Sequence, residues 1–365
     1  MKGSVLLSGY YGFDNAGDEA VLYAIIESLR QEGIEDITVL SAKPEETAAL
    51  YQVKAADRWG KKTLYQAVKN CDLLISGGGS LLQDVTSKNG ILYYLGIIGL
   101  AQFKKKPVMI YAQGIGPIGH ERNRRLTAKL LNKAQAITVR DLPSRQALLD
   151  MGVHQAVQVG VDPVMGLEAS RVDAGWGRAA LEALGWQPEG GPTLMIAIRP
   201  WTEEGERLRE LALTGDHFAN RGWQVVFLPM HYGEDNEESQ RVADIMHQPA
   251  LILPDNYTPL ETMALLQNSD LVLGMRLHTL IMAAVLGKPM AAISYDPKID
   301  GFMQSLRLEN DIMPVEQVDS AELIKLLEDI WSAKEQKVAQ VAQYMEIIAQ
   351  QAKAPAKVAA QLLKR

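Results

Sequence analysis

The chain of 365 residues is short of cysteine, of excess positive charge and of long apolar runs. Cys71 is its only cysteine, which excludes a disulfide within the chain and a zinc site built from cysteines. The formal net charge is −7, from 37 Lys and Arg against 44 Asp and Glu, whereas general nucleic-acid binders are usually basic. We therefore expect no nucleic-acid partner.

No uncharged apolar run approaches the roughly 20 residues that a membrane-spanning helix needs. The first residues, MKGSVLLSGYYG, hold an apolar run too short for the core of a signal peptide. These features favour a cytoplasmic protein that at most touches a membrane from its surface. The spacings HxxxH, HExxH and DxD are also absent, so we expect no metal site.

Residues 270–298 (DLVLGMRLHTLIMAAVLGKPMAAISYDPK) read as a buried strand, a helix and a second buried strand. In an open parallel sheet the carboxyl ends of such strands form the crevice where ligands bind. Arg276, His278 and Lys298 can converge there, with His278 in the first helical turn, where free N–H groups favour an anion. This pattern predicts a phosphate or carboxylate site.

Two alternatives remain open at this site. Arg276 could instead form a structural pair with Asp270 or Asp296. The segment after the second strand could be only a turn, in which Asp296 orients Lys298 or caps the next helix.

The amino-terminal strand, residues 4–8, is followed by a glycine-punctuated loop and a helix predicted over residues 20–30. Glycines at 9, 12 and 17 do not fit the GxGxxG dinucleotide fingerprint. The loop carries Asp14, Asn15 and Asp18, which suit sugar hydroxyls, or proton abstraction from one, better than a pyrophosphate. Alternatively, Asp18 or Glu19 simply caps the helix.

Further polar residues follow other predicted strands. Three glycines after strand 72–76 let the backbone approach a ligand closely. The strand-end residues that we single out are Gly78, Gly79, Gln83, Asp84, Gln113, Arg140 and Arg199. His231 also lies at a strand end, whereas the remaining histidines other than His278 are expected to be structural or solvated.

Strands and helices alternate along most of the chain, which predicts α/β architecture with doubly wound parallel sheets. A change of composition over residues 164–192 marks a linker. We predict an amino-terminal Rossmann-like domain over 1–166, a second over 167–333, and a long helix over 334–365 that can cross back to the first domain. Two such domains facing a cleft form the architecture of GT-B glycosyltransferases.

Several stretches together resemble the polysaccharide pyruvyl transferase family, and within it the CsaB-type enzymes of bacterial cell-wall polymer synthesis. They are GYYGFDNAGDEA, DLLISGGGSLLQD, YAQGIGP, ITVRD, GMRLHTLIMAAVLGKP and SYDPK. The resemblance implies a GT-B-like fold, phosphoenolpyruvate as donor and no cofactor. It further implies a pyruvyl ketal on the 4- and 6-hydroxyls of N-acetylmannosamine in a lipid-linked disaccharide, and a product that S-layer homology domains bind.

This chemistry needs cations for the donor and groups that move protons. We expect Arg276, Arg199, Lys298, His278 and Ser294 to bind the donor, because hydrogen bonds to charged groups are strong. His278 can transfer a proton or assist phosphate departure, Asp14 is the candidate base, and Lys298 completes the catalytic set. The residues expected to bind the acceptor are Asn15, Asp18, Gly78, Gly79, Gln83, Asp84, Gln113 and Arg140. The side-chain cations match the leaving phosphate, so we expect no metal.

A lipid-linked acceptor suggests weak contact with the cytoplasmic membrane face, for which Lys104–Lys106 and the arginines at 122, 124 and 125 are candidates. An ordinary solvated surface would show the same clusters. Two other functions fit the pattern: a GT-B glycosyltransferase using a nucleotide sugar, and a non-catalytic sugar-phosphate binding module. Acceptor linkage, ketal stereochemistry, the assignment of acid and base, and the oligomeric state stay open.

Overall fold

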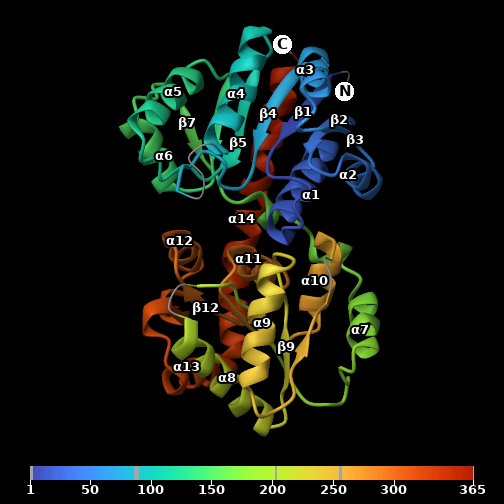
Figure 1. The fold of residues 1–365 in the computed structure, drawn as a ribbon, viewed down its shortest axis with the longest axis vertical. Helices are drawn as coiled ribbons and strands as arrows, with labels where there is room; N and C mark the ends of the chain where they lie inside the picture. Colours follow the sequence, from blue (N-terminus) through green and yellow to red (C-terminus); the bar gives the residue numbers. More distant parts are fainter. Residues whose placement is uncertain (1–2, 86–89, 202–203, 255–256, 365) are drawn as a thin grey trace. The chain divides into compact units, whose positions relative to one another are not determined.

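The computed structural model describes residues 3–85, 90–201, 204–254 and 257–364. Backbone contacts divide the chain into two compact units, each built around its own parallel sheet (Figure 1). Unit 1 comprises Met1–Phe13, Asp18–Gly166 and Ile348–Arg365, and unit 2 comprises Asp14–Gly17 and Leu167–Ile347. Each unit is therefore assembled from separate stretches of sequence.

The described part of unit 1 holds a seven-stranded parallel sheet in the order β3-β2-β1-β4-β5-β6-β7. The central strands β4 and β5 are buried throughout, as expected for a parallel sheet with helices on both faces. Its strands are β1 Ser4–Ser8, β2 Asp36–Ser41, β3 Lys54–Asp57, β4 Leu73–Gly77, β5 Val108–Gln113, β6 Ala136–Val139 and β7 Val157–Val159. The helices are α1 Ala16–Gln31, α2 Pro44–Tyr51, α3 Lys61–Asn70, α4 Gly90–Phe103, α5 Glu121–Leu131 and α6 Leu142–Asp150.

The described part of unit 2 holds a six-stranded parallel sheet in the order β10-β9-β8-β11-β12-β13. Counted within the unit this is 3-2-1-4-5-6, the Rossmann order. The strands are β8 Thr193–Ala197, β9 Gln224–Phe227, β10 Leu251–Ile252, β11 Leu271–Gly274, β12 Met290–Ser294 and β13 Ile312–Pro314. The helices are α7 Ala174–Ala183, α8 Glu204–Asn220, α9 Glu234–Ile245, α10 Pro259–Gln267, α11 Leu277–Val285, α12 Pro297–Ser305 and α13 Ser320–Ser332.

The last helix, α14 (Lys334–Leu363), has residues in both units and is the red ribbon at the end of the colour bar (Figure 1). In its unit 2 part, Lys337 forms an ion pair with the buried carboxylate of Asp311. In its unit 1 part, Ala352 packs so closely on Gly166 that a Cβ there would lie 3.2 Å away. The fold class predicted from sequence, α/β with two Rossmann-like sheets, is confirmed.

The start of helix α1 was predicted wrongly. It begins at Ala16 rather than at residue 20, so Asp18 and Glu19 lie in its first turn, where the helix dipole favours acids. The Oδ1 atom of Asn15 accepts a hydrogen bond from the Gly17 amide at 3.0 Å, which satisfies one of the free N–H groups of that turn. Gly17 had suggested a loop, but here it is helical.

Candidate functional site

The predicted donor residues lie at or beyond the carboxyl ends of three strands of unit 2, and His231 lies beyond a fourth. Arg199 follows β8, Arg276 follows β11, and Ser294 is the last residue of β12, while His231 lies beyond β9. Strands β8 and β11 are neighbours in the sheet. The strands that follow β8 in the sequence, β9 and β10, lie on one side of this pair, and those that follow β11, β12 and β13, lie on the other. Ligands of open α/β sheets bind at this topological switch point, outside the carboxyl ends of the strands.

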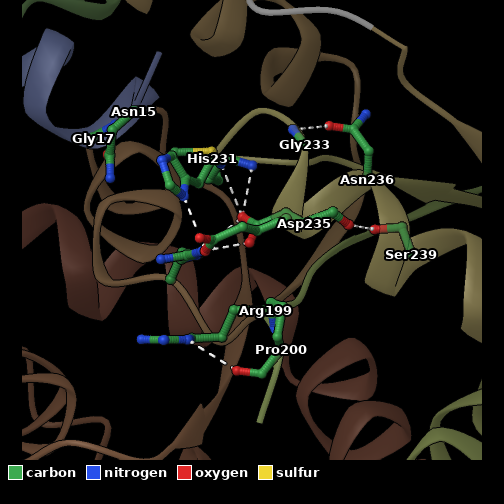
Figure 2. Close-up of polar contacts among 12 residues, drawn as sticks. Asn15, Gly17, Arg199, Pro200, His231, Gly233, Asp235, Asn236 and Ser239 are labelled. Carbon is green, nitrogen blue, oxygen red and sulfur yellow. Dashed lines mark hydrogen bonds and ion pairs between the residues drawn. The ribbon is translucent and has the colours of Figure 1, made fainter. Parts of the chain in front are cut away.

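Arg276 lies at the N-cap position of helix α11 and forms an ion pair with Asp235 in the first turn of α9. The Nε atom donates to Oδ2 at 3.0 Å, and the Nη2 atom donates to Oδ1. The carboxylate of Asp235 is fully buried and also accepts the amides of Met230, at 3.1 Å, and His231, at 2.9 Å (Figure 2). One buried side chain thus connects the loops after β9 and β11.

The structural partners predicted for Arg276 are therefore wrong. The Oδ2 atom of Asp270 accepts the amide of Thr193 at 2.8 Å. Asp296 is the N-cap of α12. The actual partner, Asp235, is separated from Arg276 by 41 residues, and only the adjacency of β9, β8 and β11 brings the two together.

The segment Asp14–Gly17 belongs to unit 2 and pairs with the loop after β9. Asn15 forms an antiparallel β-bridge with His231. The Ala16 amide donates to the Met230 carbonyl at 2.8 Å, and the Tyr232 amide donates to the Asp14 carbonyl at 3.2 Å. Asp14 has a φ of 57°, the left-handed region, which this backbone pairing helps to maintain.

His278 lies in the first turn of α11, as predicted, and contacts the same segment. A Cβ placed on Gly17 would lie 2.2 Å from His278 Nδ1, so Gly17 passes directly against the imidazole ring. Figure 2 shows Gly17 and Asn15 next to the loop that carries His231. The structure therefore places the two predicted catalytic residues Asp14 and His278 in one unit.

Arg199 and Lys298 share a different neighbour, Tyr295. The guanidinium carbon of Arg199 lies 4.6 Å from the centroid of the Tyr295 ring, and the Lys298 Nζ atom lies 5.7 Å from it. The Trp201 ring packs on the same tyrosine at a centroid distance of 5.1 Å. Arg199 Nε donates to the Pro200 carbonyl at 3.3 Å (Figure 2). Two cations are thereby held against one aromatic ring.

Asp296 performs both of the roles that the sequence left open. Its Oδ1 accepts the Lys298 amide at 3.0 Å, which caps α12, and its Oδ2 lies 3.1 Å from Lys298 Nζ. The Lys298 side chain is about one-third exposed. The hydroxyl of Ser294 is buried and donates to the Asp296 carbonyl at 3.4 Å.

The predicted donor residues thus form two contact groups at one sheet edge. Arg276 and His278 contact the Asp235 and Gly17 regions, and Arg199 and Lys298 contact Tyr295. A guanidinium fork suits a carboxylate, and an ammonium suits a phosphate as a point charge. This edge therefore offers the groups that a small multivalent anion requires.

In unit 1, the glycines after β4 pack against the beginning of α1. Gly78 has a φ of 66°, and a Cβ there would lie 1.8 Å from Val21 Cγ1, so only glycine fits. Gly79 has a φ of 63°, and a Cβ there would lie 2.9 Å from Asp18 Oδ1. The structure therefore brings the glycine turn and Asp18 together.

Gln113 and Arg140 are tied to neighbouring serines inside unit 1. Gln113 is fully buried, and its Nε2 donates to Ser76 Oγ at 2.8 Å. Arg140 Nη2 donates to Ser80 Oγ at 2.9 Å, and Nη1 lies 3.4 Å from the buried Asp162 Oδ2. The Gln113 bond joins the ends of β5 and β4, and the Arg140 contacts join the loops after β4, β6 and β7.

Asp84 and Gln83 make local contacts that shape the backbone near α5. The Asp84 carboxylate accepts the amides of Gly119, at 2.7 Å, and His120, at 3.1 Å, and the Asn123 side chain at 2.9 Å. Burial raises the pKa of Asp84, but these hydrogen bonds together outweigh that effect and the pKa is lowered. Gln83 Oε1 accepts the Val85 amide at 2.8 Å.

Asp235, Asp162 and the aromatic role of Tyr295 were not predicted from the sequence. Asp235 follows His231 by four residues, at the carboxyl end of a predicted strand, and this position was the available signal. It lies in an acidic run, Glu234–Glu238, in which nothing local distinguishes the buried carboxylate from solvated ones.

Among the described residues, no cluster of three or more His, Cys, Asp or Glu side chains is arranged to hold a metal ion. Within the same part of the chain, none of the helices combines the length and the apolar character that crossing a membrane requires.

Comparison with known proteins gives both a family and a fold. The sequence pattern of the family described as polysaccharide pyruvyl transferase matches residues 15–297. The amylovoran biosynthesis protein AmsJ of Erwinia amylovora is 24% identical over 403 aligned positions, which cover 94% of this chain and 95% of that protein.

Two solved structures have the same overall fold. The UDP-GlcNAc 2-epimerase from Neisseria meningitidis bound to UDP-GlcNAc has a TM-score of 0.65 at 15% identity, with 99% of each chain covered. Anabaena Alr3699/HepE in complex with UDP has a TM-score of 0.66 at 14% identity, again with 99% of each chain covered. At such low identity these likenesses show the fold alone, which is GT-B-like. The match over residues 15–297 spans well over half of the sequence, and the chain belongs to the polysaccharide pyruvyl transferase family.

Proposed function

We propose that this polysaccharide pyruvyl transferase moves the pyruvyl group of phosphoenolpyruvate onto two hydroxyls of one sugar and releases phosphate. The proposed acceptor is an N-acetylmannosamine residue in a lipid-linked precursor of a secondary cell-wall polymer, which receives a 4,6-ketal, as in CsaB-type enzymes. Family membership and the similarity to an amylovoran biosynthesis protein support pyruvyl transfer in polysaccharide synthesis.

The observation that carries the choice of donor is the set of cations at the carboxyl edge of the unit 2 sheet. Arg276 follows β11 at the start of helix α11, and Arg199 and Lys298 lie against Tyr295. Phosphoenolpyruvate carries its carboxylate and its phosphate on the same carbon atom, C2. Two guanidinium groups and an ammonium can bind both, because each offers charge-assisted hydrogen bonds.

The proposed reaction conserves atoms and charge. The methylene carbon C3 of the donor gains a proton, and a sugar hydroxyl oxygen forms a bond to C2. The C2–O bond to phosphate then breaks, and the second hydroxyl bonds to C2 to close the ketal. Of the two protons that the hydroxyls lose, one balances the proton gained at C3 and the other leaves with phosphate.

We assign the proton transfers to His278 and Asp14. An imidazole can donate to C3 or to the leaving phosphate, and a carboxylate can accept a hydroxyl proton. Both residues belong to unit 2, and the segment that begins with Asp14 contacts the His278 ring through Gly17. Lys298 stabilises the negative charge that the departing phosphate carries.

We assign the acceptor sugar to polar groups at the loops after β1, β4, β5 and β6. The turn at Gly78 and Gly79 lies next to Asp18, where a carboxylate and backbone N–H groups can meet sugar hydroxyls. The proposed acceptor residues are Asn15, Asp18, Gly78, Gly79, Gln83, Asp84, Gln113 and Arg140. Several of these already bond to protein groups, namely Asn15, Gln83, Asp84, Gln113 and Arg140. The three with buried side chains, Asp84, Gln113 and Arg140, would act mainly by ordering the loops.

The proposed reaction requires no metal, because the side-chain cations can neutralise the leaving phosphate.

The proposed contact with an anionic membrane surface is made by Lys104–Lys106 and the nearby exposed Phe103. Each basic residue near such a surface contributes about 1 kcal/mol to binding. Flotation of the protein with anionic but not neutral liposomes tests this contact.

The main experiment supplies phosphoenolpyruvate and a synthetic disaccharide that contains N-acetylmannosamine, and measures phosphate release and acceptor mass. Wild-type protein should release one phosphate per ketal formed, and His278→Ala should lose turnover, whereas the exposed His154→Ala should behave as wild type. A nucleotide sugar replacing phosphoenolpyruvate tests the rival glycosyltransferase function. Release of a nucleoside diphosphate with transfer of the sugar would overturn the proposal.

A further inference from the structure

Asp235 is a buried carboxylate whose hydrogen bonds meet at the strand ends of unit 2. It is fully buried, and four donors converge on it: the amides of Met230 and His231 and two nitrogens of Arg276. Helix α9 holds it firmly, because its own amide donates to the His231 carbonyl at 3.1 Å and its carbonyl accepts from Ser239 Oγ at 2.7 Å (Figure 2).

These contacts determine which edge of the Arg276 guanidinium faces a ligand. A guanidinium has five N–H groups. Asp235 takes the Nε–H and one Nη2–H, which lie on the same edge. The Nη1 and Nη2 hydrogens of the other edge then form the fork that fits a carboxylate or a phosphate. The Arg276 side chain is 16% exposed, whereas Asp235 is fully buried, so a ligand that binds this arginine must do so outside the ion pair.

The ion pair also lowers the net charge that Arg276 presents. A guanidinium paired with a buried carboxylate attracts a distant anion less than a lone guanidinium does. The ion pair therefore does little to attract an anion by charge, but it fixes the orientation of the guanidinium. The two roles predict opposite changes in KM for the donor when the charge of Asp235 is removed.

We propose that Asp235 is a positioning residue that orients Arg276 to bind the donor anion. The inference rests on the proposed function, in which Arg276 contacts phosphoenolpyruvate. The same carboxylate fixes the amides of Met230 and His231, and this loop in turn pairs with Asn15 and Ala16. Asp235 thus also supports the segment that contacts His278.

Asp235→Asn tests the inference because it keeps the shape and removes the charge. If Asp235 acts by orientation, KM for phosphoenolpyruvate should rise about tenfold or more, since hydrogen bonds to charged groups of this kind weaken. The kcat should fall less than KM rises. If Arg276 acted only through its charge, removing the neighbouring negative charge would lower KM, and this result would overturn the inference.

The matched control is Asp311→Asn, which removes another buried carboxylate of unit 2 from an ion pair, that with Lys337. It should leave KM for the donor unchanged. If Asp235→Asn does not fold, Asp235→Glu is the second variant. It keeps the charge but moves the guanidinium, and it should also raise KM for the donor.

A wild-type protein that releases no phosphate from phosphoenolpyruvate overturns the proposed function together with this inference. An active wild type and an unchanged KM in both Asp235 variants overturn only the positioning role.

Discussion

Gly17→Ala provides a test that separates folding from catalysis. Gly17 lies in the first turn of α1, and alanine is ordinarily the better helix former there by about 0.5–1 kcal/mol. The obstacle is His278, because the added Cβ would lie 2.2 Å from Nδ1, 2.8 Å from Cγ and 3.1 Å from the Cε1 atom. We therefore expect the substitution to affect His278 far more than the stability of the helix.

The size of the effect follows from these distances. Non-bonded heavy atoms are in comfortable contact at about 3.5–4 Å, so the Nδ1 atom, at 2.2 Å from the added Cβ, must retreat by roughly 1.3–1.8 Å. A misplacement of this size can lower the rate of an enzyme about a hundredfold. The global stability should change by less than about 1 kcal/mol, since the helical gain and the displaced ring oppose each other.

The assay is phosphate release under saturating donor, together with urea unfolding. Gly301→Ala is the control, because Gly301 is also a helical glycine of unit 2, but nothing lies within 4 Å of the position that an added Cβ would take. In a His278→Ala background the clash is gone, so Gly17→Ala should raise the free energy of unfolding by the helical gain alone, about 0.5–1 kcal/mol. A Gly17→Ala enzyme with wild-type kcat would refute the reasoning that joins Gly17 to the proposed catalytic role of His278.

Three other perturbations test the buried thiol, a buried carboxylate and the need for a metal. Cys71 is buried, and burial raises the pKa of its thiol to about 11, so iodoacetamide at neutral pH should label native protein far more slowly than unfolded protein; rapid native labelling would contradict this. Asp84→Ala should lower the free energy of unfolding by about 1–3 kcal/mol at pH 7, because three hydrogen bonds are lost. The pKa of Asp84 is lower in the folded state than in the unfolded state. Its contribution to the free energy of unfolding is therefore present above the unfolded pKa of about 3.9 and is lost as pH falls through the folded pKa. A difference in unfolding free energy between wild type and Asp84→Ala that is the same at pH 7 and in strong acid would contradict this. Turnover should survive EDTA, and activity lost to EDTA and restored by magnesium would show that a metal is needed.

The fold could be predicted from the sequence because its signals are local. Buried parallel strands read as short apolar runs, and polar residues follow them, so the α/β units appear directly. The start of α1 was misplaced because a glycine in a first turn resembles a loop. Position 17 is glycine because the ring of His278, 261 positions away in the sequence, leaves no space for a Cβ.

The site was predicted only in part, for a related reason. Strand order predicts which loops share an edge, and it brought Arg199, Arg276 and His278 to the same sheet edge. It does not predict which carboxylate becomes buried. Asp270 and Asp296 were closer to Arg276 in sequence, whereas Asp235 reaches it through the neighbouring strand β9. Sequence spacing does not reveal ion-pair partners that only tertiary packing brings together.

Helix α14 contributes residues to both units, and this affects when each unit can be completed during translation. The chain passes from one unit to the other after residues 13, 17, 166 and 347. Residues 348–363 emerge from the ribosome after all of unit 2, yet Ala352, Ala356 and Ala359 are buried in unit 1. Unit 1 is therefore complete only after all of unit 2 has been translated, so a whole amino-terminal domain cannot form while the rest of the chain is still being made. For the same reason, neither unit can be expressed whole as one continuous fragment.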